Sequence, residues 1–484
     1  MDLEHWLGRA VEEHRRWTAS FGPRPAHPAL AVDAGELSSA FAELTERLGG
    51  SYPFFHPRYA AQMLKPPHPV AVAGYLAAML VNPNNHALDG GPATSALEAE
   101  VVERLAAMFG YGDHLGHLTS SGTIGNLEAL FVARETHPGK GVAFSSDSHY
   151  THARMCHLLG VPAHVVPTDG RGRMDLSALE RVLATGTVGT VVATAGTTGL
   201  GAVDPVDGIL ALTEPAGVRV HVDAAYGGFF TLLADADADA EGRAAEGPLV
   251  DPRPWRALPR CDSVVVDPHK HGLQPYGCGA VLFRDPEVQR FYRHDSPYTY
   301  FTSRRPHLGE ISLECSRSGA SAAALWLTLR LFPLTRDGLG QILAAGRRAA
   351  LRWADLIGAS PHLDLYQRPQ LDIVTYYPRL TPPSLSRIAA AGEGVMRRGV
   401  NGAAGDRVFL STARVGAEEF AARRPDAVRD AAGTTVLRSV LMKPESELWL
   451  DRLHRRVEAL AAEEAEEAEE AEEADGGSGG KGHG

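Results

Sequence analysis

The sequence predicts an α/β protein, with a large domain built on a mostly parallel sheet and a small α+β domain after it. Three observations support this prediction. The chain has 484 residues, which is too long for one simple core. From about residue 74, short apolar runs alternate with helical segments, as in βαβ units. From about residue 335 this alternation stops, and a long amphipathic helix and well-separated strands follow.

The expected strands of the large domain are short apolar runs bounded by polar or turn residues. They are VAF (142–144), AHVVP (163–167), TVVATAG (190–196), VRVHVDAAY (218–226), SVVVDPHK (263–270) and GAVLF (279–283). Helices are expected between them, for example GNLEALFVARE and LSALERVLA. Another helix is expected over 97–110, because its apolar residues fall on one face. We expect Thr94 or Ser95 to cap that helix and Gly110 to end it.

The chain is expected to divide into four parts. Residues 1–55 are an N-terminal helical segment, 56–334 the large domain, 335–460 the small domain and 461–484 an acidic, low-complexity tail that is disordered. The small domain should contain a helix in LGQILAAGRRAALRWADLIGA and strands in LDIVTYYP, RVFLSTAR and TTVLRSVLMKP. The acidic stretch 234–248 is expected to be an exposed loop.

Composition excludes several classes of protein. Hydrophobic residues make up 44% and charged residues 22%, as in ordinary soluble proteins, and no apolar run is long enough to cross a membrane. The net charge is −12, but residues 461–484 contribute −8 of it, so the folded body is only mildly acidic and carries no nucleic-acid footprint. The four cysteines have no paired spacing, so we expect neither disulfides nor a metal site. The N-terminal segment has no secretory pattern, and a cytoplasmic location is expected.

Polar residues collect where the expected parallel strands end. Thr194 follows TVVA, Asp223 follows VRVHV, and His269 and Lys270 follow SVVVDP. Ligands of open α/β sheets bind beyond these carboxyl ends. A carboxylate and a lysine at neighbouring strand ends are costly to bury unless each is paired with a partner group. Pyridoxal phosphate (PLP) uses both, because its aldehyde forms an imine with a lysine and its pyridine nitrogen is kept protonated by a carboxylate.

The other requirements of PLP also have candidates in the sequence. Lys270 is the expected imine lysine and Asp223 the partner of the pyridine nitrogen. The cofactor-binding set is completed by residues that could hold the phosphate, lie against either face of the ring or reach its hydroxyl: Ser121, Gly122, Thr123, His149, Ala225, Thr194 and His269. HLTSSGTIGNLEALF (117–131) should place the phosphate group at a helix N-terminus.

These segments resemble the group II PLP-dependent amino acid decarboxylases, a family that includes the tyrosine/aspartate, aromatic amino acid and glutamate decarboxylases. The matching stretches are DGGPATSALEAEVV, TSSGTIGNLEAL, DSHYTHAR, VVATAGTTGLGAVDP, HVDAAYGG, VVVDPHKHG, LECSRSGASAAALW and VLRSVLMKP, in the family's order over about residues 75–445. One departure is Lys443, where relatives often have asparagine.

The resemblance implies an aspartate aminotransferase-like fold with a seven-stranded sheet, PLP as cofactor, and loss of CO2 from an L-amino acid with an aromatic or acidic side chain. It implies His149 as a catalytic residue beside Lys270, and a loop tyrosine, Tyr298 or Tyr300, as the acid that protonates the substrate carbon. It also implies a homodimer with active sites at the interface, clasped by the N-terminal segment.

Some alternatives stay open. Decarboxylative oxidative deamination, transamination or another reaction could follow from the same cofactor, and a non-catalytic protein could keep the fold. Arg317, in CSRSG, could bind a substrate carboxylate, although a structural ion pair is the favoured interpretation.

Overall fold

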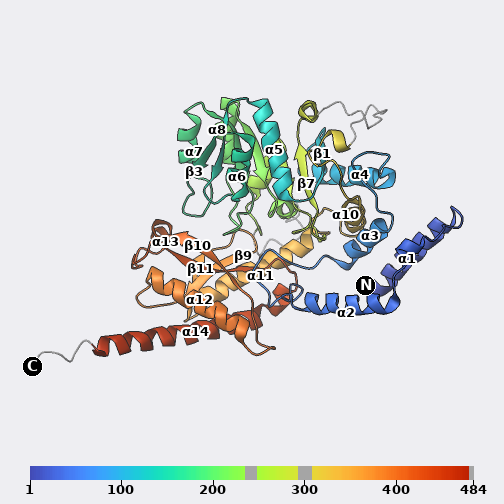
Figure 1. Cartoon of the computed structure of the whole chain (residues 1–484). Helices are drawn as coiled ribbons and strands as arrows, with labels where there is room; N and C mark the ends of the chain where they lie inside the picture. Colours follow the sequence, from blue (N-terminus) through green and yellow to red (C-terminus); the bar gives the residue numbers. More distant parts are fainter. Residues whose placement is uncertain (235–247, 293–307, 479–484) are drawn as a thin grey trace, which may run out of the picture.

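Figure 1 shows the computed structural model, which describes residues 1–234, 248–292 and 308–478. A large domain contains the seven-stranded sheet, and a smaller domain lies beside it with a four-stranded sheet. Two N-terminal helices extend from this body as an arm, and the last helix runs away from it at the opposite end (Figure 1).

The strands of the large sheet run in the order β1-β7-β6-β5-β4-β2-β3. Their bounds are β1 (Leu115–Thr119), β2 (Gly141–Ser145), β3 (Ala163–Val166), β4 (Val188–Thr194), β5 (Arg219–Asp223), β6 (Ser263–Val266) and β7 (Gly279–Phe283). Strand β7 is antiparallel to both of its neighbours, and the strands from β6 to β3 are parallel. The expected mostly parallel sheet is therefore confirmed. Its central strands are buried along their whole length, which is why they read as continuous apolar runs.

The sheet of the small domain is antiparallel, in the order β10-β11-β9-β8. Its strands are β8 (Leu363–Gln367), β9 (Ile373–Pro378), β10 (Ser411–Gly416) and β11 (Gly433–Val440). Three of them fall in the runs that the sequence predicts.

The helices of the large domain are α3 (Pro69–Met79), α4 (Pro92–Met108), α5 (Gly122–Thr136), α6 (Thr151–Leu159), α7 (Leu176–Leu183), α8 (Val206–Thr213), α9 (Pro252–Ala257) and α10 (Ala320–Leu331). Those of the small domain are α11 (Gly340–Ala359), α12 (Leu385–Asn401), α13 (Ala417–Arg423) and α14 (Ser446–Ser478). Helix α10 packs on α3 and α4, whereas α11 packs on α14 and on β8 and β9. Helix α11 also packs on the segment Gly228–Leu233, which follows β5 of the large sheet.

Helix α4 begins earlier than the sequence predicts. It starts at Pro92, its N-cap is Gly91, and no side chain caps it, so Thr94 and Ser95 lie inside the first turn and are buried. Proline suits the first position of a helix because it has no N–H to leave unpaired. Gly110 follows the helix with a φ of +75°, and a Cβ there would lie 2.7 Å from Pro259. Glycine is required at this position.

The acidic tail differs from the expected disordered segment, because helix α14 continues through residue 478. Its first turn beyond residue 460 is packed against the small domain: Ala461 is buried, and Glu464 pairs with Arg398 of α12. Glu467 also pairs with Arg398. These contacts are long-range in the sequence, so local composition gave no sign of them.

The N-terminal arm consists of α1 (Leu3–Ala19) and α2 (Ala34–Gly49). Helix α1 packs against α3, but every residue of α2 is exposed. On α2, Leu37, Phe41, Leu44 and Leu48 are spaced to share one face, and each is at least half exposed. The arm therefore presents an apolar face that nothing in the described part of this chain covers.

Candidate active site

The expected site residues converge at the carboxyl ends of the central strands. The parallel register of β4 and β5 places Thr194 beside Asp223. Asp267 directly follows β6, the next strand, and Lys270 lies three residues further along. A single cavity opens over these ends. It is lined by nine of the eleven residues that the sequence predicts, namely Ser121, Gly122, Thr123, His149, Thr194, Asp223, Ala225, His269 and Lys270. The remaining two, Tyr298 and Tyr300, lie outside the described residues.

Asp223 is held as a carboxylate at the base of the cavity. It is only 5% exposed, and its Oδ2 accepts a hydrogen bond from Nε2 of His152 at 2.9 Å. Burial alone would raise the pKa of this carboxyl, but the hydrogen bond and charge of His152 and the charge of Lys270 outweigh it. The pKa of Asp223 therefore lies well below its ordinary value, and the side chain can keep a proton on a basic nitrogen in the cavity.

Lys270 reaches the cavity beside a second carboxylate. Its Nζ lies 3.2 Å from Oδ2 of Asp267, and about a fifth of its side chain is exposed. Asp267 is itself 3% exposed and also lies 3.5 Å from Nε2 of His269. Burial lowers the pKa of His269, which favours the neutral ring. Asp267 thus provides a counter-charge for the amine of Lys270.

His149 stands at the start of α6, half-buried at the cavity wall. One ring nitrogen, Nδ1, lies 2.7 Å from Oγ1 of Thr151, which fixes the ring's orientation. Burial lowers the pKa of His149, so its ring is uncharged near neutral pH. A neutral aromatic ring of fixed orientation suits stacking against a flat ligand.

The N-terminus of α5 faces the same cavity. Ser121 is its N-cap residue in an extended conformation, but its side chain makes no capping hydrogen bond. Gly122 is tightly enclosed, because a Cβ there would lie 2.8 Å from Oδ2 of Asp267 and 3.0 Å from Cβ of Ala225. The free N–H groups of this first turn, with the hydroxyls of Ser121 and Thr123, form a site of the kind that holds phosphate.

The residues present fit PLP. Three polar atoms at the cavity are buried and lack a partner within the described chain: Oγ1 of Thr194, Oδ1 of Asp267 and Nδ1 of His269. Buried polar atoms are rarely left unpaired, so a polar ligand is expected to use them. The anionic base at Asp223, the amine of Lys270 and the helix N-terminus together match the pyridine nitrogen, aldehyde and phosphate of the cofactor.

Comparison with known proteins also supports PLP as the cofactor. The family described as "Pyridoxal-dependent decarboxylase conserved domain" matches residues 52–377, more than half of the chain. This chain belongs to the pyridoxal-dependent decarboxylase family. It is an enzyme that uses PLP to decarboxylate amino acids, which confirms the expected cofactor and reaction class.

Two relatives of this decarboxylase are similar to it over more than half of its length. The L-tyrosine decarboxylase of Enterococcus faecium is 29% identical over 450 residues, covering 72% of this chain and 74% of that protein. The probable L-tyrosine/L-aspartate decarboxylase of Methanosphaerula palustris is 30% identical over 292 residues, covering 60% and 73%.

Solved structures share the fold at lower identity. Mouse CSAD has a TM-score of 0.73 and 22% identity over 93% of this chain and 91% of that one. Oryza sativa TDC, solved with PLP and tryptamine, has a TM-score of 0.74 and 17% identity over 95% and 98%. These likenesses confirm the expected fold.

Sequence reasoning missed two residues of the decarboxylase's site. His152 lies within the stretch DSHYTHAR, three positions after His149, and only its hydrogen bond to Asp223 identifies it. Asp267 lies three positions before Lys270, so its place beside the amine was available from the sequence. Attention to the carboxylate three positions before Lys270 would have found Asp267, whereas nothing local in the sequence pairs His152 with Asp223, 71 residues away.

Arg317 does not line the cavity. Its Nη1 lies 3.1 Å from Oε1 of Glu98, and both side chains are buried. Glu98 also accepts hydrogen bonds from Nδ2 of Asn85 and the backbone N–H of Leu118. The favoured interpretation of Arg317 as a structural ion pair is therefore confirmed.

Within the described chain, no group of three or more metal-ligating side chains is found, and no helix has the length and apolar character to cross a membrane. All four cysteines are free.

Proposed function

We propose that this decarboxylase removes the α-carboxyl group of an aromatic or acidic L-amino acid, and that L-tyrosine and L-aspartate are the substrates to test first. The observation that carries the proposal is one cavity that joins Asp223, Lys270 and the N-terminus of α5. The named tyrosine and tyrosine/aspartate relatives support the choice of substrates.

The residues of the cavity would each have a definite part in the reaction. Lys270 supplies the amine to which the cofactor attaches, and Asp267 balances its charge. Asp223, held anionic by His152, keeps a proton on the pyridine nitrogen. When bound, PLP supplies a ring that accepts the electron pair left by the departing CO2.

Two further side chains would orient the reacting groups. The ring of His149 would lie over one face of a bound cofactor, and Ala225 would leave room for the other face. The free hydroxyl of Thr194 donates to the cofactor or to the substrate carboxylate. Holding the scissile bond in one orientation supplies much of the rate enhancement expected here.

The proton that replaces CO2 is assigned to Tyr298 or Tyr300, on the sequence alone. This step decides between simple decarboxylation and the other outcomes. A solved structure of similar fold, at 17% identity, is described as Rhodiola rosea 4-hydroxyphenylacetaldehyde synthase, so the products must be identified rather than assumed.

The decisive experiment supplies the purified, PLP-saturated protein with L-tyrosine, L-aspartate, L-glutamate and L-2,4-diaminobutyrate, and measures CO2, amine, aldehyde and peroxide. We expect CO2 and amine in equal amounts with L-tyrosine or L-aspartate. Lys270→Ala should lose both activity and the visible absorption of lysine-bound PLP, whereas the exposed Lys140→Ala should keep both. Aldehyde and peroxide in place of amine, or no turnover of any of the four, would overturn the proposal.

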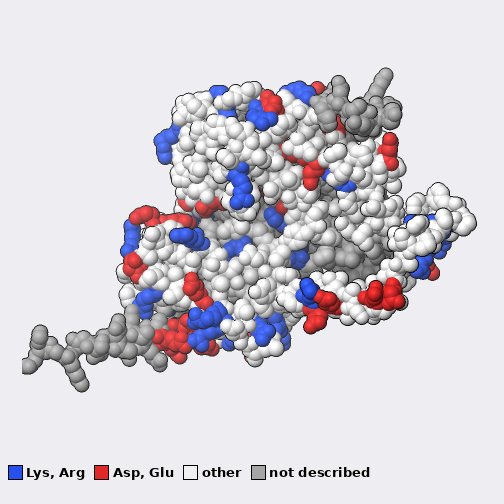
Figure 2. All heavy atoms as spheres, viewed as in Figure 1, with Lys and Arg blue, Asp and Glu red and all other residues white. Residues whose placement is uncertain are grey.

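We also propose that the enzyme works as a homodimer in the cytoplasm. The exposed apolar face of α2 supports the dimer, because a single copy leaves this face in water. The four free cysteines are consistent with a reducing compartment. Figure 2 shows charges of both signs scattered over the visible face, with acidic side chains gathered where α14 leaves the small domain. This face shows no extended basic surface for a nucleic acid.

A further inference from the structure

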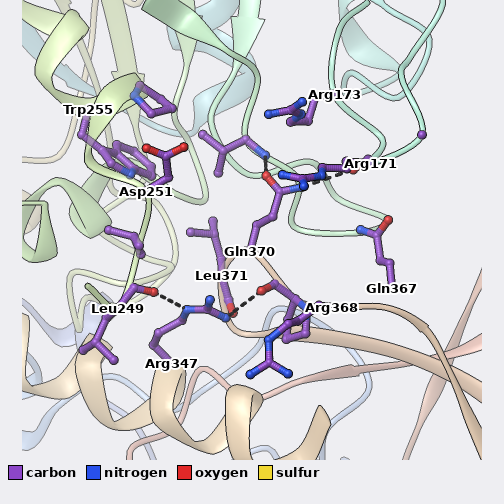
Figure 3. A pocket seen from close by; sticks show the side chains of 15 residues that line it. Arg171, Arg173, Leu249, Asp251, Trp255, Arg347, Gln367, Arg368, Gln370 and Leu371 are labelled. Carbon is purple, nitrogen blue, oxygen red and sulfur yellow. Dashed lines mark hydrogen bonds between the residues drawn. The ribbon is translucent and has the colours of Figure 1, made fainter. Parts of the chain in front are cut away.

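A second cavity, of about 360 Å³, lies away from the active site where the two domains meet. Its walls come from the turn before α7, the segment that leads into α9, helix α11 and the connection between β8 and β9. Figure 3 shows this cavity with Arg171 and Arg173 on one side, Trp255 and Asp251 on another, and Arg347 and Arg368 below. No residue is shared with the lining of the active-site cavity.

Arg347 is the central feature of this second cavity. It is 7% exposed, and its guanidinium donates to three backbone carbonyls: Nε to Leu249, and Nη1 to Pro369 and Leu371 (Figure 3). Its Nη2 has no hydrogen-bond partner among the described residues. This nitrogen is not completely buried, and it belongs to a side chain that lines the cavity, so it is open to a ligand there. The carboxylate of Asp372 forms no ion pair with Arg347 among the described residues; it accepts a hydrogen bond from the hydroxyl of Tyr226 at 2.6 Å and acts on Arg347 only through space.

A buried guanidinium that only neutral carbonyls satisfy is an incomplete site. Carbonyl dipoles orient the cation but supply no opposite charge, and the carboxylate of Asp372 makes no direct contact with it. Guanidinium groups pair preferentially with carboxylate or phosphate, often through two parallel hydrogen bonds. Arg347 therefore holds a donor in place for an anion that reaches the cavity.

The other charges around the cavity add to this preference. Arg171 makes no ion pair with any described residue, and Arg368 pairs only with the exposed Asp355. The acidic residue of the lining, Asp251, is already engaged by Arg253 through Nη2 at 2.6 Å. Arg173 is likewise held by Asp169, at 2.6 Å. The unpaired charge in the cavity is thus positive.

The rest of the lining is mixed, because Gln367 and Gln370 are polar and several other residues are apolar. Trp255, Val250, Pro254 and Leu371 are buried side chains of the cavity wall. Apolar side chains beside arginines suit an organic molecule with an anionic group rather than a fully hydrated ion. We propose that this cavity binds a small organic carboxylate, whose anionic group meets Arg347, Arg171 and Arg368 and whose apolar part lies against Trp255.

The position of the cavity connects this ligand to the active site. Gln370 of its lining accepts a hydrogen bond from the backbone N–H of Val203. The next residue, Asp204, accepts hydrogen bonds from the backbone of Thr194 and of Met174. A bound carboxylate would therefore brace the two domains beside the loop that fixes Thr194.

The test uses the full-length, PLP-saturated enzyme and titration calorimetry. The probes are 3-phenylpropionate and phenylacetate, with benzylamine as a cation of similar shape and inorganic phosphate as a small anion. We expect saturable binding of the two carboxylates. Arg171→Ala and Arg368→Ala should each weaken this binding about tenfold, as the loss of one charge-assisted hydrogen bond implies.

Arg352→Ala is the matched control, because Arg352 makes the same kind of exposed ion pair, with Asp451 at 2.6 Å, but does not line the cavity. It should leave binding unchanged, and all three variants should keep the wild-type visible absorption of PLP. Three outcomes would overturn the proposal: no saturable carboxylate binding, equal binding in the Arg171 and Arg368 variants, or binding of benzylamine or phosphate as tight as that of the carboxylates.

Discussion

Nε2 of His152 lies 2.9 Å from Oδ2 of Asp223, and both side chains are almost completely buried. This pair joins the start of α6 to the end of β5. It keeps negative charge at the base of the cavity, where burial alone would favour the protonated acid. The first prediction follows from this relationship.

Replacing His152 should impair catalysis by altering Asp223. Burial raises the pKa of Asp223, and His152 counters this effect with its hydrogen bond and charge. In His152→Ala this counter-effect is lost, so the pKa of Asp223 rises from its depressed value. Because the pKa of Asp223 is depressed, its carboxylate is ionised, and therefore active, at every pH above that pKa. The carboxylate becomes protonated, and activity is lost, as the pH falls through that pKa. The acid limb of the kcat profile should therefore move to higher pH, with kcat reduced about tenfold or more.

The control for this experiment is His157→Ala, which changes an exposed histidine on the same helix and should leave the profile unchanged. His152→Gln, which keeps an N–H donor, should recover part of the loss. An acid limb that stays in place in His152→Ala would show that this histidine has only a packing role.

Gly122 should be required for cofactor binding. A Cβ at this position would lie 2.8 Å from Asp267 and 3.0 Å from Ala225, so Gly122→Ala must move the first turn of α5 or a wall of the cavity. We expect the Kd for PLP, measured by absorbance titration, to rise at least about tenfold. Gly199→Ala is the matched control near the site, since a Cβ there meets no atom within 4 Å. Equal PLP affinity in the two variants would contradict the proposed phosphate site.

The buried pair of Arg317 and Glu98 should matter for stability rather than for substrate binding. Arg317→Met leaves the Glu98 carboxylate buried without its cation, a change that costs about 3–5 kcal/mol. The melting temperature should fall by several degrees, and adding Glu98→Gln should restore part of it. The exposed pair of Arg348 and Glu447 should contribute only about 0–1 kcal/mol, so Arg348→Ala serves as the comparison. A raised KM with an unchanged melting temperature in Arg317→Met would instead indicate a substrate-binding role.

The apolar face of α2 should be needed for dimerisation. Phe41→Glu with Leu48→Glu places two charges on side chains that are each 61% exposed in the single chain, so the fold of one copy should survive. Light scattering should then report a monomer, whereas the wild type gives a dimer. Leu158→Glu, at a leucine on α6 that is 70% exposed, should leave the dimer intact. A dimer that persists in the double variant would exclude α2 from the interface.

The sequence by itself determined the fold class and most of the residues that line the candidate site. The apolar runs that became β2, β4, β6 and β7 are buried on both faces, so their composition records their structure. Asp223 and Lys270 could be found because a carboxylate and a lysine at neighbouring strand ends are costly to bury without a partner. The position of β1 to β7 in one sheet then places the strand ends together.

Only the tertiary structure decided the features that depend on contacts distant in the sequence. The hydrogen bond between His152 and Asp223 spans 71 residues, and the packing of α14 depends on Arg398 of another helix. The open guanidinium of Arg347 is set by carbonyls 22 to 98 residues away. Pairings of this kind leave no local periodicity, because each is selected by the geometry of the folded chain and not by its neighbours.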